Sequence, residues 1–399
     1  MAETFTPSGR PLWAEIDLDA LAYNLRFLKA RAGKAQIAAV VKANAYGHGA
    51  VGISRFLLEE GVDALAVVST EEALQLRRAG ITAPILVMGP TPPQDAPHLV
   101  ELEVIPTIAS YEGALALAEA AAQRGKVQPV HLKVDTGLNR FGLPPNEAVA
   151  LAQAIRQMAS LRLEGLFTHF ASAEEGDKDY TIDQFRHFMN VCLQIPWVNL
   201  RHVANTATII DMPELCLEMA RPGLGLYGYL PPGMAASLDL RPVLSLKARL
   251  MRIIDVPAGQ TVSYGRTWQA QRPSRVGLVP CGYADGLPRA LSNRGWMLVR
   301  GQRAPIVGRI CMDMTLIDIT HIPHAQVGDE VVIIGRQGEE EVSAEHIAFL
   351  CDTIVYEVLS GIGPRVPRVF IKGGQVKAIE TFAPAFQQYA TTLIPRGRS

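Results

Sequence analysis

Eight short apolar segments recur along the first half of the chain, and stretches with helical spacing separate most of them. Eight strands that alternate with helices over about 210 residues match the size of a (β/α)8 barrel. An open, doubly wound sheet is disfavoured, because no glycine-rich dinucleotide fingerprint follows the first of these segments. The eight predicted strands are residues 36–41, 64–68, 85–88, 104–108, 130–134, 163–167, 201–203 and 217–220.

The second half of the chain changes to short alternating strands separated by glycine and proline turns, which is typical of a β domain. One late helix is expected at residues 344–360. The predicted fold class is therefore α/β, with an N-terminal (β/α)8 TIM-like barrel and a C-terminal mainly-β domain. We expect a barrel domain at 12–238, a β domain at 239–385 that residues 1–11 could join, and a mobile tail at 386–399.

Charge and cysteine content restrict the possible partners. The formal net charge is −1, so no strong field attracts nucleic acid or an anionic membrane. No apolar run approaches the roughly 20 residues that a membrane helix needs. The five cysteines are scattered, and no spacing suggests a metal site. A reducing, cytoplasmic location without nucleic-acid, membrane or metal partners is expected.

Lys42 directly follows the first apolar segment of the predicted barrel, and residues 43–49 then turn the chain. The carboxyl ends of parallel strands are where α/β enzymes place their chemistry. Apolar neighbours would remove water from the amine, favour its neutral form and make it nucleophilic. Such an amine can bond covalently to an aldehyde cofactor. Taken alone, Lys42 could also be a strand-end lysine that reaches solvent.

Charged and polar side chains also follow the later predicted strands. Lys133 lies on the fifth strand and Arg140 in the loop after it. His169 follows the sixth strand, Thr206 the seventh and Arg221 the eighth. The carboxyl ends of barrel strands converge on one mouth. The sequence therefore predicts that these side chains gather there, although Lys133 could point outward and His169 could be structural.

Several cations at one mouth would repel one another unless an anion lay among them. A phosphate group is the natural anion. Backbone N–H groups at Gly223 and Leu224 and hydroxyls at Tyr46 and Thr206 could hold it. The glycine could equally be a simple turn residue.

Seven motifs resemble those of bacterial alanine racemases, in the same order and over about residues 11–375. The first contains Lys42 and the second contains Lys133 and Arg140. A motif that starts at Arg221 follows. The motifs are residues 41–49, 133–142, 221–228, 262–265, 282–286, 308–313 and 364–368.

The resemblance implies a homodimeric isomerase that interconverts L- and D-alanine with pyridoxal 5'-phosphate and supplies D-alanine for peptidoglycan. It implies a two-base mechanism in which Lys42 bonds to the cofactor and is one base. Tyr264 of the partner subunit is the other base. The resemblance implies cofactor-binding roles for Lys42, Tyr46, His169, Thr206, Arg221, Gly223, Leu224 and Tyr356, substrate-binding roles for Arg140 and Met312, and supporting roles for Lys133, Tyr283, Cys311 and Asp313.

Three positions depart mildly from the family pattern: Thr206 replaces a usual serine, and Leu138 and Leu224 replace a methionine and an isoleucine. A related amino-acid decarboxylase is disfavoured, because that class uses an acidic residue where this chain has Arg221. A racemase with a broader range that includes serine remains open. Whether Lys133 is carbamylated, as the matching lysine of the family often is, also remains open.

Overall fold

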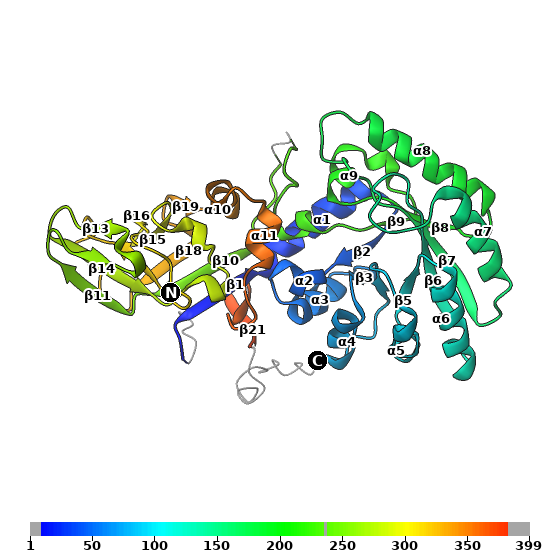
Figure 1. Ribbon diagram of the computed structural model, residues 1–399, viewed down its shortest axis with the longest axis horizontal. Helices are drawn as coiled ribbons and strands as arrows, with labels where there is room; N and C mark the ends of the chain where they lie inside the picture. The colour runs from blue at the N-terminus through cyan, green and yellow to red at the C-terminus, as the bar shows by residue number, and fades with distance from the viewer. Residues whose placement is uncertain (1–8, 235–237, 382–399) are drawn as a thin grey trace. The chain divides into compact units, whose positions relative to one another are not determined.

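Two compact units make up the chain in this computed structural model, which describes residues 9–234 and 238–381 (Figure 1). We call residues 22–45 and 53–240 the barrel unit, and residues 1–21, 46–52 and 241–399 the strand-rich unit. Both names refer to the described residues within these ranges. The predicted tail, residues 386–399, lies outside them. No helix that the structure describes is both long and apolar enough to cross a lipid bilayer.

The described part of the barrel unit contains one sheet of eight parallel strands. From β2 to β8, each strand pairs with the strand that follows it in the sequence. The last strand, β9, pairs with the first, β2. The Glu218 N–H donates to the Arg201 carbonyl at 3.2 Å between β8 and β9. This nearly closed barrel confirms the predicted fold class. The strands are β2 Gln36–Val40, β3 Ala64–Val67, β4 Ile85–Val87, β5 Ile105–Ile108, β6 Gln128–Lys133, β7 Leu161–Phe167, β8 Leu200–His202 and β9 Met219–Ala220.

Helices occupy the predicted intervals between the barrel strands, and their apolar faces are buried. The Ser69 hydroxyl accepts from the Glu72 N–H at 3.4 Å and caps α4, as the Ser-Thr-Glu-Glu sequence predicts. The Ser110 hydroxyl caps α6 in the same way. The helices are α1 Leu18–Ala32, α3 Ala50–Glu59, α4 Thr70–Arg78, α5 Ala96–Glu101, α6 Tyr111–Gln123, α7 Pro145–Arg156, α8 Asp179–Gln194 and α9 Thr206–Asp211, with 3-10 turns at Pro93–Asp95, Pro213–Leu215 and Leu224–Tyr227.

The strand-rich unit is built on a mixed sheet with the order β16-β15-β18-β10-β1-β20-β21, and β19 pairs with β18. A smaller sheet has the order β11-β14-β17, and β12 pairs with β13. The strands are β1 Leu12–Asp17, β10 Leu244–Arg249, β11 Arg252–Val256, β12 Thr261–Val262, β13 Trp268–Gln269, β14 Ser274–Val279, β15 Trp296–Val299, β16 Gln302–Pro305, β17 Thr315–Asp318, β18 Glu330–Gln337, β19 Glu340–Val342, β20 Arg368–Lys372 and β21 Gln375–Glu380. The helices are α10 Ala344–Cys351 and α11 Val355–Ser360, with 3-10 turns at Tyr264–Arg266, Tyr283–Asp285 and Arg289–Leu291.

Two details differ from the sequence prediction. The sequence places residues 12–17 in the barrel domain, but β1 pairs antiparallel with β10 and parallel with β20. The apolar pattern of residues 12–17 predicts a strand, but it carries no information about which strand lies beside it. The sequence also predicts one helix at 344–360, whereas α10 ends at a left-handed Asp352 (φ 53°) before α11 begins. The helical spacing of apolar residues continues through Asp352, so the sequence pattern does not reveal the break. The left-handed backbone of Asp352 is what separates the two helices.

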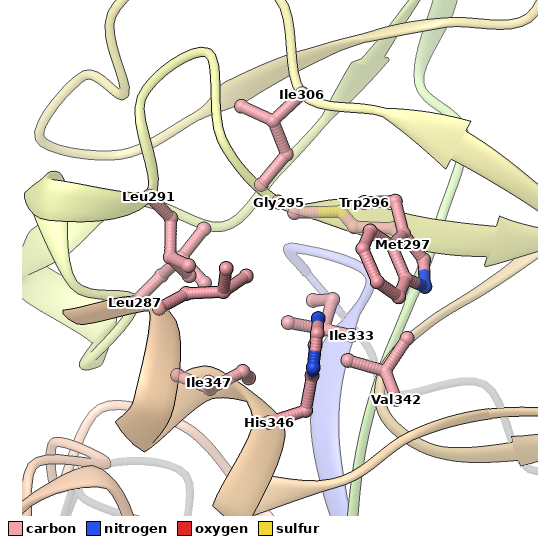
Figure 2. A pocket seen from close by; sticks show the side chains of 11 residues that line it. Leu287, Leu291, Gly295, Trp296, Met297, Ile306, Ile333, Val342, His346 and Ile347 are labelled. Atoms are coloured by element: carbon pink, nitrogen blue, oxygen red, sulfur yellow. The ribbon is translucent and has the colours of Figure 1, made fainter. Parts of the chain in front are cut away.

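A small cavity lies inside the strand-rich unit between β15 and α10 (Figure 2). The Trp296 and His346 rings lie at its edge, with their centroids 4.3 Å apart. The cavity volume is about 10 Å³, which is close to the space that one water molecule requires. It is too small for any larger ligand.

Arg368 on β20 is a charged residue whose side chain is buried inside the strand-rich unit. Its guanidinium donates to the carbonyls of Gly47 at 2.9 Å, Ile362 at 2.7 Å, Gly363 at 2.7 Å and Val366 at 2.6 Å. Burial lowers the pKa of Arg368 to about 10, and Glu380 opposes that shift. One side chain thus fixes the turn after Tyr46 and the loop before β20.

We expect Arg368→Met to lower the free energy of unfolding by roughly 2–4 kcal/mol, because it leaves four carbonyls without their charged donor. Urea unfolding followed by circular dichroism measures the change. The exposed Arg336→Met variant is the matched control and should change stability by less than about 0.5 kcal/mol. Equal stability of the two variants would show that the hydrogen bonds of the buried Arg368 guanidinium contribute nothing to the free energy of unfolding.

Candidate active site

The chain leaves β2 through a left-handed turn that begins at Lys42. Ala43, Asn44, Ala45 and Tyr46 all have φ between 50° and 54°. Each such residue costs about 1–2 kcal/mol relative to the right-handed form, and strain of this kind persists only where its surroundings enforce it. The sequence predicts a turn here but not its hand.

The Glu72 carboxylate is one of the groups that hold this turn. Its two oxygens accept from the Ala43 N–H at 2.7 Å and the Val68 N–H at 2.8 Å. The Ala45 N–H donates to the Val41 carbonyl at 2.8 Å. The backbone beside Lys42 is therefore fixed by groups on β2, on the segment after β3 and on α4.

The Lys42 side chain is half-buried, and its pKa is lowered. Desolvation is the main cause, the positive charge of Arg140 adds to it, and Glu72 opposes both. The shift makes the neutral amine more accessible than in an exposed lysine, as the sequence suggests.

Lys133 points into the barrel unit and is almost completely buried. Its ammonium lies over the rings of Phe141 and Phe167, at 4.8 and 5.0 Å from their centroids. Desolvation lowers its pKa to about 7, and the charges of Arg221 and Arg140 act in the same direction. The outward orientation that the sequence left open is wrong.

Arg221 is also buried, immediately after β9. Its guanidinium donates to the Thr168 carbonyl at 2.9 Å, the Val203 carbonyl at 3.3 Å and His202 Nδ1 at 2.7 Å. Burial lowers the pKa of Arg221 to about 9. The pKa of the half-buried His169 is well below its ordinary value, because of desolvation and then the charge of Arg221, with smaller effects from Lys133, Arg140 and Lys42.

Four cations therefore act on one another in the barrel unit: Lys42, Lys133, Arg140 and Arg221. In the ranges that the structure describes, none of the four forms an ion pair with a carboxylate. Buried charge without a counter-charge is costly. This arrangement is suited to an anionic ligand.

Thr206 organises the loop that follows β9. Its hydroxyl oxygen accepts from the Gly223 N–H at 3.1 Å and the Gly225 N–H at 3.2 Å. Two accepted bonds use both lone pairs, so the hydroxyl proton is directed to a further acceptor. With Leu224 at the start of the next 3-10 turn, the loop has donors of the kind that bind phosphate.

The remaining predicted residues lie in the strand-rich unit. The Tyr46 and Tyr356 rings are 6.0 Å apart. The Tyr283 N–H donates to the Cys311 carbonyl at 3.1 Å. The Tyr264 side chain is 71% exposed. The predicted site residues of this unit are Tyr46, Tyr264, Tyr283, Cys311, Met312, Asp313 and Tyr356.

A buried carboxylate that the sequence prediction did not single out fixes the loops of the strand-rich unit. Asp285 pairs with Arg10 and with Arg365, the latter at 2.7 Å. Arg365 also pairs with Asp313 at 2.7 Å. The Asp285 carboxylate accepts from the Gly282 N–H at 2.9 Å. These bonds connect the loop of Tyr283 to the loop of Asp313.

Two buried histidines were also missed by the sequence prediction. His131 on β6 and His202 on β8 form a hydrogen bond of 2.9 Å between Nδ1 and Nε2. His131 lies between the apolar Val130 and Leu132, and His202 precedes the apolar Val203, and this is the signal that the sequence offers. Because the two residues are 71 positions apart in the sequence, sequence spacing does not reveal that they are in contact.

Comparisons with known proteins agree along most of the chain. The family model for the N-terminal domain of alanine racemase matches residues 16–231, and the model for the C-terminal domain matches 243–370. An alanine racemase of Halothermothrix orenii is 45% identical and covers 90% of this chain and 97% of its own length. One of Clostridium tetani is 43% identical and covers 94% of this chain and 98% of its own.

Solved structures give the same result. An alanine racemase of Clostridium difficile has a TM-score of 0.90 and 38% identity, and covers 94% of this chain and 99% of its own. An alanine racemase of Bacillus anthracis with bound L-Ala-P has a TM-score of 0.87 and 35% identity, and covers 94% and 98%.

We expect acid to destabilise the barrel unit through its buried histidines. Desolvation lowers the pKa of His131 to about 3, and the pKa of His202 is also well below its ordinary value. Between about pH 6.5 and 3 the unfolded chain binds protons that the folded chain does not, so stability falls as pH falls below 6.5. Each histidine adds roughly 1.4 kcal/mol per pH unit to the slope.

His131→Asn should therefore reduce the pH dependence of the free energy of unfolding by about one proton. Urea unfolding at about pH 6 and about pH 5, where the unfolded histidine is mostly protonated, measures it. The exposed His98→Asn variant is the control. A slope for His131→Asn equal to that of the native chain would contradict the assignment of a neutral buried imidazole.

Proposed function

Because this chain belongs to the alanine racemase family, we propose that it interconverts L- and D-alanine with pyridoxal 5'-phosphate through two bases, Lys42 and Tyr264. Its similarity to alanine racemases over most of its length supports the assignment as an alanine racemase enzyme. The observation that carries the finer proposal is the group of four cations, Lys42 among them, that form no ion pair with a carboxylate of the described residues.

The donor set of the barrel unit fits the proposed cofactor. Lys42 would supply the amine that bonds to its aldehyde, and the Thr206 hydroxyl and the Leu224 N–H would supply donors for its phosphate. The Gly223 N–H, which donates to Thr206 in this structure, would turn to the phosphate as well. Tyr46 and Tyr356 are the further phosphate ligands of the proposal. When bound, pyridoxal phosphate captures the amino group of alanine and withdraws electrons, which acidifies the α-carbon.

Arg221 would hold the ring nitrogen of the cofactor. A guanidinium only donates hydrogen bonds and stays protonated, so Arg221 would keep a proton off that nitrogen. The contacts of Arg221 with Thr168, Val203 and His202 fix its orientation before any ligand arrives. In this proposal Arg221 moderates electron withdrawal and favours quick return of the proton.

The substrate carboxylate would be held by Arg140 and by the N–H group of Met312 of the partner subunit. Arg140 is exposed in the loop after β6 and lowers the pKa of both Lys42 and Lys133. Carbamylation would turn Lys133 from a cation into an anion that orients Arg140. Because the pKa of Lys133 is about 7, its amine is partly neutral at physiological pH and is available for carbamylation.

Racemisation requires a proton to leave one face of the α-carbon and another to reach the opposite face. Lys42 would move the proton on one face. Tyr264 of the partner subunit would move it on the other, with support from His169. The exposure of Tyr264, Met312 and Tyr283 on the strand-rich unit supports a homodimer, because exposed apolar groups that gather on loops commonly mark an interface.

We also place this activity in the cytoplasm, where D-alanine would be supplied for peptidoglycan. The free thiols of all five cysteines suit a reducing compartment. Alanine is the proposed substrate, and parallel assays with serine would measure the breadth of the side-chain range.

Tyr264→Phe should lower deuterium exchange at the α-carbon of L-alanine by roughly 100-fold or more, with a much smaller effect on D-alanine. The measurement is exchange in deuterated buffer with added pyridoxal phosphate, followed by NMR. Tyr111→Phe removes an exposed hydroxyl from the barrel unit and should behave as the native enzyme. Equal loss from both isomers in Tyr264→Phe would refute the assignment of Tyr264 to one face.

Mixing inactive Lys42→Ala chains with Tyr264→Phe chains tests the shared site. A mixed dimer contains one site with both bases intact. Random exchange of subunits should therefore restore about a quarter of the native activity. A fully active monomer on a sizing column, or no recovery after verified exchange, would exclude the shared arrangement.

A further inference from the structure

Three buried polar side chains form a continuous hydrogen-bonded chain inside the barrel unit. His131 on β6 bonds through Nδ1 to His202 Nε2 on β8 at 2.9 Å. His202 bonds through Nδ1 to the Arg221 guanidinium at 2.7 Å. All three side chains are almost completely inaccessible to solvent. The proposed reaction uses Arg221 but assigns no role to His131.

The chemistry of Arg221 fixes the direction of every hydrogen bond in this chain. A guanidinium has no acceptor, so His202 Nδ1 must accept. The proton of a neutral His202 therefore lies on Nε2, which donates to His131 Nδ1. His131 in turn must carry its own proton on Nε2. The Arg221 donor at one nitrogen and the His131 acceptor at the other therefore both select the Nε2–H tautomer of His202.

Protonation of His202 would break this order. A charged imidazole donates from both nitrogens, so His202 Nδ1–H would then face the Arg221 guanidinium N–H. Lys133 lies nearby as a further positive charge, and no carboxylate of the residues that the structure describes acts on His202. Charge and hydrogen-bond direction therefore both favour two neutral rings.

Packing holds both rings in register. The Phe167 ring stacks on His202 with an interplanar angle of 4° and centroids 4.8 Å apart. Gly165 on β7 lies opposite His131 in the strand register. A Cβ at Gly165 would come 2.7 Å from His131 Nε2, so only glycine leaves room for this ring. In the described ranges His131 Nε2 has no hydrogen-bond partner. The series of hydrogen bonds that starts at Arg221 therefore ends at His131.

We propose that His131 is a positioning residue for Arg221. By accepting the proton of His202 Nε2, it holds His202 in the tautomer that accepts from Arg221, and this fixes the guanidinium in the barrel unit. The tautomer chain is independent of the proposed function. Its effect on catalysis rests on the proposed cofactor contact of Arg221.

Nitrogen-15 NMR of histidine-labelled protein tests the tautomers directly. We expect both His131 and His202 of the native chain to carry their protons on Nε2. In His131→Phe the buried Nε2–H of His202 loses its acceptor, and an unsatisfied buried donor is costly, so the His202 signal should shift toward Nδ1–H or become mixed. His131→Asn places an amide oxygen near the lost Nδ1 acceptor and should restore the native His202 signal. A native His202 protonated on Nδ1 would overturn the proposal, even if no variant folds.

Cofactor binding provides the second readout. The dissociation constant of pyridoxal phosphate should rise by roughly tenfold in His131→Phe, as for other losses of a supporting hydrogen bond, and its bound absorption spectrum should change. His131→Asn should recover most of both properties. The exposed His98→Phe variant is the matched control. A native affinity and spectrum in folded His131→Phe would refute the positioning role.

The two experiments separate two kinds of failure. If native protein does not bind pyridoxal phosphate but shows both predicted tautomers, the proposed function fails and the hydrogen-bond chain stands. If native protein binds the cofactor but His202 keeps its tautomer in His131→Phe, the positioning role fails and the proposed function stands.

Discussion

Positive charge that no carboxylate pairs with, among the residues that the structure describes, is the constraint on which the barrel unit depends. Lys133 and Arg221 are buried, and burial of a charge is costly unless the surroundings compensate it. Here the compensation comes from neutral groups: carbonyls around Arg221 and aromatic rings around Lys133. The remaining positive potential lowers the pKa of Lys42 and Lys133 and makes the unit suited to an anion. The chemistry proposed for the protein follows from this imbalance.

The same potential explains why imidazoles, rather than carboxylates, surround Arg221. A carboxylate would neutralise the guanidinium and remove the attraction for a ligand. A neutral imidazole supplies an acceptor without a charge. His202 does this directly, and His131 does it one step further away. The tautomer of His202 then depends on a donor on one side, Arg221, and an acceptor on the other, His131.

Rigid backbone accompanies the charged groups in both units. In the barrel unit, the left-handed residues after Lys42 are held by the Glu72 carboxylate. In the strand-rich unit, Asp285 and Arg365 fix the loop of Asp313. Strained or looped backbone keeps one conformation only when several bonds over-determine it. Buried polar groups provide those bonds here, and this is a cost in stability that a structural core alone would not require.

The sequence by itself determined the order of strands and helices and the position of Lys42 after β2, because these depend on local period, caps and turn residues. It also identified the family through motifs in the right order. Only the tertiary structure decided that β1 joins β10 and β20, that Lys133 points inward, and that Asp352 breaks the predicted late helix. The contact of His131 with His202 joins residues 71 positions apart. Local spacing carries no information about such a partner, because it is the pairing of β7 with both β6 and β8 that places these two strands on either side of it.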